Sequence, residues 1–273
     1  MRFLLILRRH WGTEIGMIII KDEHALQKIR EAGRRVAQIL HDVRNILEAG
    51  ISTLQIDSWI AEQLKKHELV SQSQGYRGYR HVSCISINKE VVHGIPHERK
   101  ILKSGDLVTV DVCAAWQGYC ADAARTYIVG EGSQQAHMLI DAAQRALDAG
   151  ISKAVVGGRL GDISAAVQRE VEQAGYAVIR DFCGHGIGAN MHEEPEILNY
   201  GTPGRGAVLK AGMVFAIEPM IAAGSHEVQI EADGWTATTV DGSLAAHIED
   251  TVIITESGPE VVTRRKDEGL YET

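Results

Sequence analysis

Apolar residues recur at helical spacing over two stretches near the start of the chain. The first stretch, from Asp22 to Glu48, has apolar positions mostly three or four residues apart: Leu26, Ile29, Val36, Ile39, Leu40, Val43, Ile46 and Leu47. This stripe predicts an amphipathic helix that Asp22 caps and Gly50 ends. The second stretch predicts another helix, which begins near Ser52 or Thr53 and carries Ile56, Ile60 and Leu64 on one face.

Two further helices are predicted in the second half of the chain. Ser133 is a suitable N-cap for a helix that runs to Ala149, with Gly150 directly after its end. Asp162 is the expected cap of the last helix, and Gly175 is its expected stop. The apolar face of that helix is predicted to carry Ile163, Val167 and Val171.

Shorter apolar and β-branched runs between these helices predict strands. Val82 to Ile87 alternates between apolar and polar residues, and Val91 to Pro96 reads as a strand end that breaks into a loop. The remaining predicted strands are Tyr176 to Arg180, Met213 to Glu218 and Thr251 to Thr255.

The stretch from Leu107 to Thr126 predicts a β-hairpin that carries two acids. Its first strand begins with the apolar, β-branched run from Leu107 to Val110, and Gln117-Gly118 suits the turn. A turn at this position brings Asp111 and Asp122 nearly opposite each other across the two strands. Opposed carboxylates repel each other, so a bound cation is one explanation for the pair. An exposed hairpin whose acids face water is the other.

The chain contains an internal repeat, in which segment 102–111 matches segment 209–218. Asp111 therefore corresponds to Glu218, and the same offset aligns the apolar faces of the second and fourth helices. Each acid is followed by a second one before the next β-rich run, Asp122 in the first half and Glu249 in the second, where the interval is longer. Two such halves, packed about a pseudo-twofold axis, would bring four carboxylates together at their seam.

A histidine accompanies these acids in the glycine-rich run CGHGIG, where flanking glycines allow close approach to His185. Four carboxylates and a histidine in one pocket need positive counter-charge. Two divalent ions supply it, because bridging carboxylates hold such ions roughly 3.5–4 Å apart. An oxygen-rich set with one imidazole suits Co, Mn, Fe or Zn and does not select among them. The alternative is a loop histidine that binds nothing.

Composition narrows the function classes. The 273 residues carry a formal net charge of -8, which argues against a broad nucleic-acid-binding surface. The four cysteines form no CxxC pair, so neither a disulfide framework nor a structural zinc site is expected. No apolar run is long enough to predict a membrane span.

Five motifs resemble those of type I methionine aminopeptidases of the short, bacterial kind: CISINKEVVHGIP, VTVDVCAAWQGYCAD, CGHGIGANMHEEP, FAIEPM and HIEDT. The resemblance covers roughly residues 17–262. It implies an α+β fold of the pita-bread (creatinase/aminopeptidase) kind, with two pseudo-symmetric halves of antiparallel sheet flanked by helices. It also implies a metal-dependent hydrolase that removes the N-terminal methionine from nascent proteins and peptides with a small second residue, using water activated by two metal ions.

The resemblance assigns roles to particular residues. The implied metal ligands are Asp111, Asp122, His185, Glu218 and Glu249, of which Asp122 and Glu249 would bridge the two ions. His93 and His192 are expected to contact the substrate and to act in catalysis together with Glu218. The pocket for the methionine side chain is expected to contain Tyr76, Tyr79, Cys84 and Trp235.

We expect an N-terminal appendage, 1–16, one catalytic domain, 17–262, with halves of about 17–130 and 131–262, and a C-terminal tail, 263–273. Removal of the appendage is expected to leave folding and activity intact, because the repeat and every motif lie beyond it. The expected protein is a cytoplasmic monomer that acts on nascent polypeptide N-termini and associates transiently with ribosomes. Neither a membrane nor a specific nucleic acid is expected among its binding partners.

Two other functions fit parts of the pattern. A proline-specific peptidase of the same fold would share the site, but such enzymes carry a large extra N-terminal domain, for which the segment before Met17 is too short. A non-enzymatic peptide-binding module would keep the fold and lose ligands, whereas all five implied ligands are present here.

Overall fold

The two apolar stretches near the start of the chain form helices in the computed structural model, which describes residues 17–265. Helix α1 (Glu23–Asp42) begins after Asp22, whose Oδ1 accepts a hydrogen bond from the Ala25 amide at 2.9 Å. It is shorter than predicted, because the stripe continues into a 3₁₀ turn, η1 (Val43–Ile46). Helix α2 (Thr53–Lys66) begins with a capping box between Ser52 and Gln55.

The two helices of the second half correct two predictions. Helix α3 (Gln134–Ile151) is capped by Ser133 as expected, but Gly150 lies inside it. A Cβ on Gly150 would lie 2.7 Å from Cγ2 of Val167, so glycine permits close packing on the next helix here. Helix α4 (Leu160–Gln173) begins two residues before Asp162. Asp162 lies in its first turn, where its carboxylate accepts from the Arg159 amide at 2.8 Å.

Within residues 17–265, the strands form four sheets, and every pairing of strands is antiparallel. The first sheet contains β1 (Val70–Ser71), β4 (Leu107–Trp116), β2 (Cys84–Ile87) and β5 (Tyr119–Ile128), with β4 at its centre. The second has the order β13 (Ala245–His247), β10 (Met220–Ala222), β6 (Ala177–Val178). The third has the order β11 (Val228–Ile230), β12 (Ala237–Thr239), β3 (Glu90–Val92). The fourth has the order β15 (Gly258–Val261), β14 (Asp250–Thr255), β9 (Val214–Ile217), β7 (Gly184–Gly186), β8 (Glu193–Ile197).

The hairpin of β4 and β5 turns at Gln117 and Gly118, as predicted. Both turn residues have positive φ, 47° and 83°, which is the geometry of a two-residue type I′ turn. In the resulting register Asp122 pairs with Cys113 and Asp111 with Ala124. The two acids are therefore diagonal neighbours on one face of the sheet.

The repeat is visible in the helices and strands. Helix α4 is as long as α2, and the offset that relates the two helices also relates the first residues of β9 and β4. The residues that lengthen the second interval form strands β10 to β13, which lie between β9 and β14 in the chain. After these strands the chain runs back beside β9, where Asp250 of β14 pairs with Ile217.

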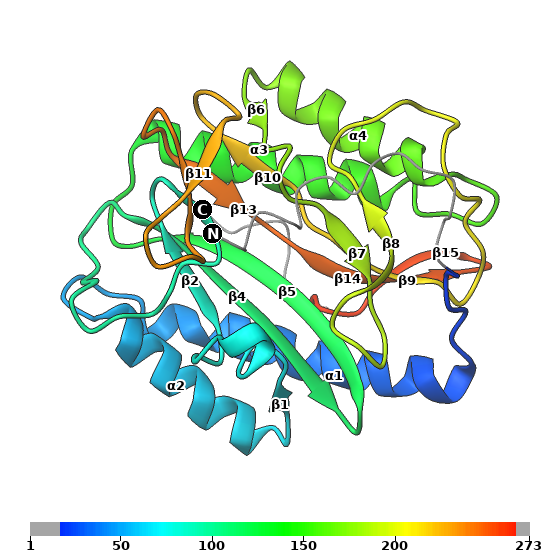
Figure 1. Ribbon diagram of the computed structural model, residues 1–273, viewed down its shortest axis with the longest axis horizontal. Coiled ribbons are helices and arrows are strands. Elements are labelled where there is room, and N and C mark those ends of the chain that lie inside the picture. The colour runs from blue at the N-terminus through cyan, green and yellow to red at the C-terminus, as the bar shows by residue number, and fades with distance from the viewer. Residues whose placement is uncertain (1–16, 266–273) are drawn as a thin grey trace.

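Helices cover the sheets from two sides. Figure 1 shows α1 and α2 along one side of the molecule and α3 and α4 along the opposite side, with the long strands between them. One apolar core lies between α1, α2 and the β4–β5 hairpin, and includes Val36, Ile60 and Val110. Another lies between α3, α4 and the strands of the second half, and includes Leu147, Val167 and Phe215.

The ends of the chain bear on the expected division. The predicted appendage, 1–16, and residues 266–273 lie outside the described residues. The first residues of the expected tail contact the body of the protein, because Thr263 donates to Asp250 at 2.8 Å and Arg264 forms an ion pair with Asp148 at 2.7 Å. No helix among residues 17–265 has the length and apolar character that crossing a membrane requires.

Candidate metal centre

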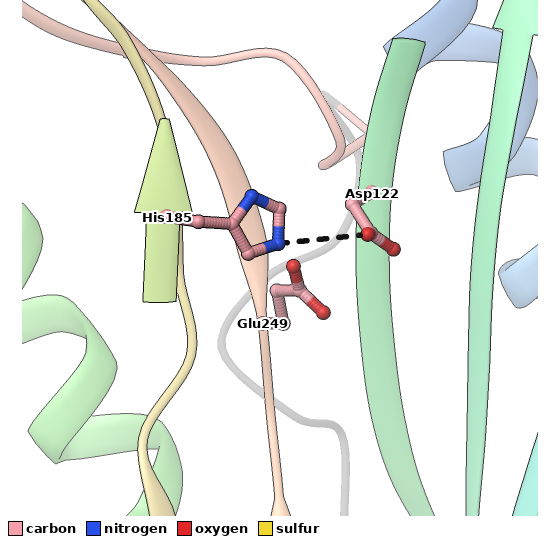
Figure 2. A group of neighbouring side chains, drawn as sticks. All are labelled: Asp122, His185 and Glu249. Carbon is pink, nitrogen blue, oxygen red and sulfur yellow. Dashed lines mark ion pairs between the residues drawn. The ribbon is translucent and has the colours of Figure 1, made fainter. Parts of the chain in front are cut away.

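Three of the predicted ligands converge from three separate strands or strand ends. Asp122 lies on β5, His185 is the central residue of β7, and Glu249 directly precedes β14. Their side chains point toward one another (Figure 2), and one ligand atom from each lies within 4.8 Å of the others. His185 Nε2 is 3.9 Å from Asp122 Oδ2. Residues far apart in the sequence thus bring together side chains of the kinds that bind metal ions.

The other two predicted ligands lie beside this group. Glu218 directly follows β9, and its Oε1 is 3.6 Å from His185 Nε2. Asp111 lies on β4, diagonal to Asp122. Burial raises the pKa of Asp111 well above its usual value, and the charge of Asp122 raises it further. All five residues predicted from the motifs are therefore neighbours in the fold.

The acids of the group bring like charges together in a buried place. Burial, followed by the charges of Asp122 and the other acids, raises the pKa of both Glu218 and Glu249 well above the usual range. Burial raises the pKa of Asp122 to about 6. Burial, with a smaller effect of His192, lowers the pKa of His185 to about 3, so its imidazole is neutral and can act as a ligand. A cation would relieve the repulsion among the acids.

Several buried atoms of the group have no hydrogen-bond partner among the described residues: Asp122 Oδ1, Glu249 Oε1 and both ring nitrogens of His247. Buried polar atoms are normally satisfied, so these exceptions call for an explanation. Carboxylate oxygens and imidazole nitrogens are ligand atoms for Mn, Fe, Co and Zn. The donor set therefore fits divalent metal ions.

His247 begins the HIEDT motif, but it was not predicted to be a ligand. Its Nε2 lies 3.7 Å from Glu218 Oε2 and 3.7 Å from Glu249 Oε2. The sequence contained a signal for it, because His247 and Glu249 are two residues apart in a β-rich run, and such residues point to the same side of a strand.

The two histidines expected to contact substrate lie near the acids and are surrounded by aromatic rings. His192 is exposed, and its ring centroid is 4.5 Å from that of His185 and 5.3 Å from that of Tyr76. His93 has a φ of 59°, a strained value for a residue with a side chain. The centroid of its ring lies 5.4 Å from that of Phe182. Phe182 directly precedes the CGHGIG run, but the motifs did not predict this contact.

Of the other predicted pocket residues, Tyr79 and Trp235 contact each other, and Cys84 lies beside the acids. The rings of Tyr79 and Trp235 meet edge to face, with their centroids 5.0 Å apart. The centroid of the Trp235 ring also lies 6.5 Å from that of His93. The hydroxyl of Tyr79 donates to the carbonyl of Ser83 at 2.9 Å, which fixes the ring. Cys84 lies opposite Asp111 in the β2–β4 pairing, and this places it next to the acids. A hollow lined by Tyr79, Trp235, Ile95 and Asp233 opens beside this aromatic cluster.

Backbone contacts join the two halves beneath the acids. The Glu249 amide donates to the carbonyl of Ala124 at 3.0 Å. The Asp122 amide donates to Thr251 Oγ1 at 2.9 Å, and the same hydroxyl donates to the carbonyl of Asp122 at 2.8 Å. These contacts set β5 against β14, so the position of two of the acids depends on both halves of the chain.

Comparison with known proteins gives a consistent result. Residues 27–256 match the model of metallopeptidase family M24. A methionine aminopeptidase of Clostridium acetobutylicum is 45% identical over 247 residues, which are 90% of this chain and 99% of that protein. A methionine aminopeptidase of Escherichia coli is 40% identical over 254 residues, which are 93% of this chain and 96% of that protein.

Solved structures show the same likeness. The methionine aminopeptidase of Thermotoga maritima superposes with a TM-score of 0.90 at 45% identity, over 91% of this chain and all of that one. The prolidase of Pyrococcus furiosus superposes with a TM-score of 0.73 at 22% identity, over 91% of this chain and 66% of that one, which is a likeness of fold. The pita-bread fold predicted from the motifs is confirmed.

Proposed function

Because the chain belongs to metallopeptidase family M24, we propose that it is a metal-dependent methionine aminopeptidase acting on nascent proteins and peptides with a small second residue. The observation that carries the proposal is the convergence of Asp122, His185 and Glu249, with Asp111 and Glu218 beside them. Its similarity to methionine aminopeptidases extends over nine-tenths of the chain. The alternatives are not favoured: the likeness to the Pyrococcus prolidase is one of fold, and a binding module would not retain a full ligand set.

We assign the metal ions to Asp111, Asp122, His185, Glu218 and Glu249, with Asp122 and Glu249 shared between them. When bound, divalent ions polarise the scissile carbonyl and lower the pKa of a coordinated water toward neutrality. The protein supplies the ligands from strands β4, β5 and β7 and from the residues flanking β9 and β14. Strands within packed sheets hold such side chains more precisely than loops do.

The positions of Glu218, His192 and His93 support the roles that we propose for them. Glu218 lies within the group and is placed to take a proton from the attacking water and pass it to the leaving amine. His192 is exposed next to His185, where it can donate a hydrogen bond to the oxygen of the tetrahedral intermediate or to the scissile amide. Burial, with a smaller effect of His192, lowers the pKa of His93 to about 4, so a neutral ring is available to hydrogen-bond the substrate backbone.

Tyr76, Tyr79, Trp235 and Cys84 are proposed to bind the methionine side chain. Aromatic rings make favourable contacts with a thioether sulfur. The contacts of Tyr76 with His192 and of Trp235 with His93 support a pocket next to the residues that would act on the peptide bond. We also propose a cytoplasmic monomer that meets nascent chains during transient contact with the ribosome.

The protein, reconstituted with divalent metal, is expected to release methionine from Met-Ala-Xaa peptides and nothing from Ala-Pro-Xaa peptides. Chelation of the metal should abolish the release, because the ions activate the water. Free amino acids after incubation, separated by chromatography, provide the measurement. Cleavage of Ala-Pro-Xaa without release of methionine would reject the proposed specificity and favour the proline-specific alternative.

Two single substitutions, Asp111→Asn in the first half and Glu218→Gln in the second, are each expected to weaken metal binding by more than about 100-fold. Losing a residue that only orients a ligand costs at most about 100-fold in metal affinity. Each substitution removes a charge that balances the ions, so activity should fall together with the metal content. Metal content after dialysis and turnover of Met-Ala-Xaa are measured on the same samples. Glu98→Gln, which changes an exposed carboxylate outside the ligand groups, is the control. Full metal content with full turnover in either variant would contradict the assignment.

A further inference from the structure

We infer that His247 is a sixth metal ligand, so that each of the two ions is bound by one imidazole. This inference rests on the proposed function, because it assumes the metal pair at the carboxylate group. Its starting point is that the described residues contain two ligand groups that share one carboxylate. The first is Asp122, His185 and Glu249, and the second is Glu218, His247 and Glu249.

The strands place the two imidazoles on either side of Glu218. His185 pairs with Ala216, two residues before Glu218, in the β7–β9 pairing. His247 pairs with Met220, two residues after Glu218, in the β10–β13 pairing. Each carboxylate oxygen of Glu218 therefore faces one ring: Oε1 is 3.6 Å from His185 Nε2, and Oε2 is 3.7 Å from His247 Nε2.

The distances at His247 exceed those of hydrogen bonds and match those between ligands of one metal ion. Its Nε2 is 3.7 Å from both Glu218 Oε2 and Glu249 Oε2. With bonds of roughly 2.1 Å, neighbouring ligand atoms around a tetrahedral ion lie about 3.4 Å apart. An imidazole that served only to orient these carboxylates would donate a hydrogen bond to one of them, at roughly 2.7–3.2 Å.

His247 is held rigidly and has no other partner for its ring among the described residues. It is 2% exposed, and neither ring nitrogen has a hydrogen-bond partner there. Its amide donates to Thr126 Oγ1 at 3.2 Å, and its carbonyl accepts from the same hydroxyl at 2.9 Å. The backbone is thus fixed against β5, while the ring faces the acids. A buried imidazole without a partner is costly, and coordination would satisfy one of its nitrogens.

A second imidazole makes the ligand set less oxygen-rich. Imidazole favours Zn, Co, Fe and Ni over hard cations such as Mg and Ca, which prefer oxygen. We therefore expect both ions, and not only the one at His185, to be borderline transition metals.

Cobalt-substituted protein tests the inference, because a paramagnetic Co²⁺ ion strongly shifts the proton resonances of imidazoles bound to it. In the full chain loaded with two equivalents of Co²⁺, we expect hyperfine-shifted resonances from two imidazole rings. In His247→Gln one set should disappear, and calorimetry should show one Co²⁺ site weakened at least tenfold and the other changed less than threefold. His226→Gln, which changes an exposed histidine outside both ligand groups, should keep both sets.

The wild-type spectrum can overturn the inference even if His247→Gln folds poorly. Two bound Co²⁺ ions with resonances from a single imidazole ring would overturn the inference and leave the proposed function standing. Failure of the wild-type protein to bind Co²⁺ at all would overturn the proposed metal site and this inference with it.

Discussion

His192→Ala is expected to lower kcat by about 10²–10³ while both metal ions stay bound, which is the usual cost of losing a transition-state hydrogen bond. His192 is exposed beside His185 and Tyr76, and it belongs to neither of the two ligand groups. Its imidazole can therefore act on the reacting peptide without holding metal. Affinity for a product peptide should change little, because the contact forms only as charge develops on the oxygen.

His185→Ala is the matched comparison, seven positions earlier in the same segment. His185 lies on β7 within the ligand group, so its loss should remove metal first and activity as a consequence. Metal titration by calorimetry, alongside steady-state kinetics on Met-Ala-Xaa, separates the two variants. His192→Gln, which keeps a hydrogen-bond donor, should recover part of the lost kcat. Equal loss of metal in His192→Ala and His185→Ala would refute this division of roles.

The hairpin acids could be predicted because local sequence determines them. The turn at Gln117-Gly118 sets the register, and the register places Asp111 and Asp122 on one face. The internal repeat then pointed to Glu218 and Glu249. Such a local signal is reliable, because a two-residue turn with positive φ allows few other registers between its two strands.

The errors arose where tertiary packing decides. Gly150 looked like a helix stop, yet it lies where α3 and α4 approach each other. Asp162 looked like an N-cap, but Arg159 and Gly204 donate to it from the start of the helix and from a distant loop. The position of His247 beside Glu218 was not predicted, because it depends on the pairing of β13 with β10. Neither spacing nor composition encodes that pairing.

A buried ion cluster next to the metal centre is the second feature with a large expected effect. Asp250, which is 0% exposed, directly follows Glu249. Its Oδ1 accepts from Arg125 at 2.7 Å and its Oδ2 from Arg264 at 2.5 Å, and Thr263 donates to Oδ1 as well. Arg125 also donates to the carbonyl of Glu249 at 2.5 Å. The cluster thereby ties β5, β14 and the end of the described chain to the backbone of a proposed ligand.

Asp250→Ala is expected to destabilise the protein by about 3–5 kcal/mol, because removing one member of a buried ion pair leaves the opposite charge uncompensated. For a domain of this size that corresponds to a melting temperature lower by roughly 6–20 °C. Thermal unfolding followed by circular dichroism measures the change. Glu256→Ala, an exposed acid just after β14, should change the melting temperature by less than about 2 °C.

The pH dependence gives an independent check on the same cluster. Burial alone would raise the pKa of Asp250, but Arg125 and Arg264 more than offset this and hold it below the usual value. A carboxylate with a lowered folded-state pKa contributes its full stability above the unfolded-state pKa of about 3.9. That contribution is lost as the pH falls through the lower folded-state pKa. The difference in stability between the wild-type protein and Asp250→Ala should therefore be constant near neutrality and shrink below about pH 3.9. A difference that is small at pH 7, or that grows on acidification, would show that the two arginines do not stabilise the fold through this carboxylate.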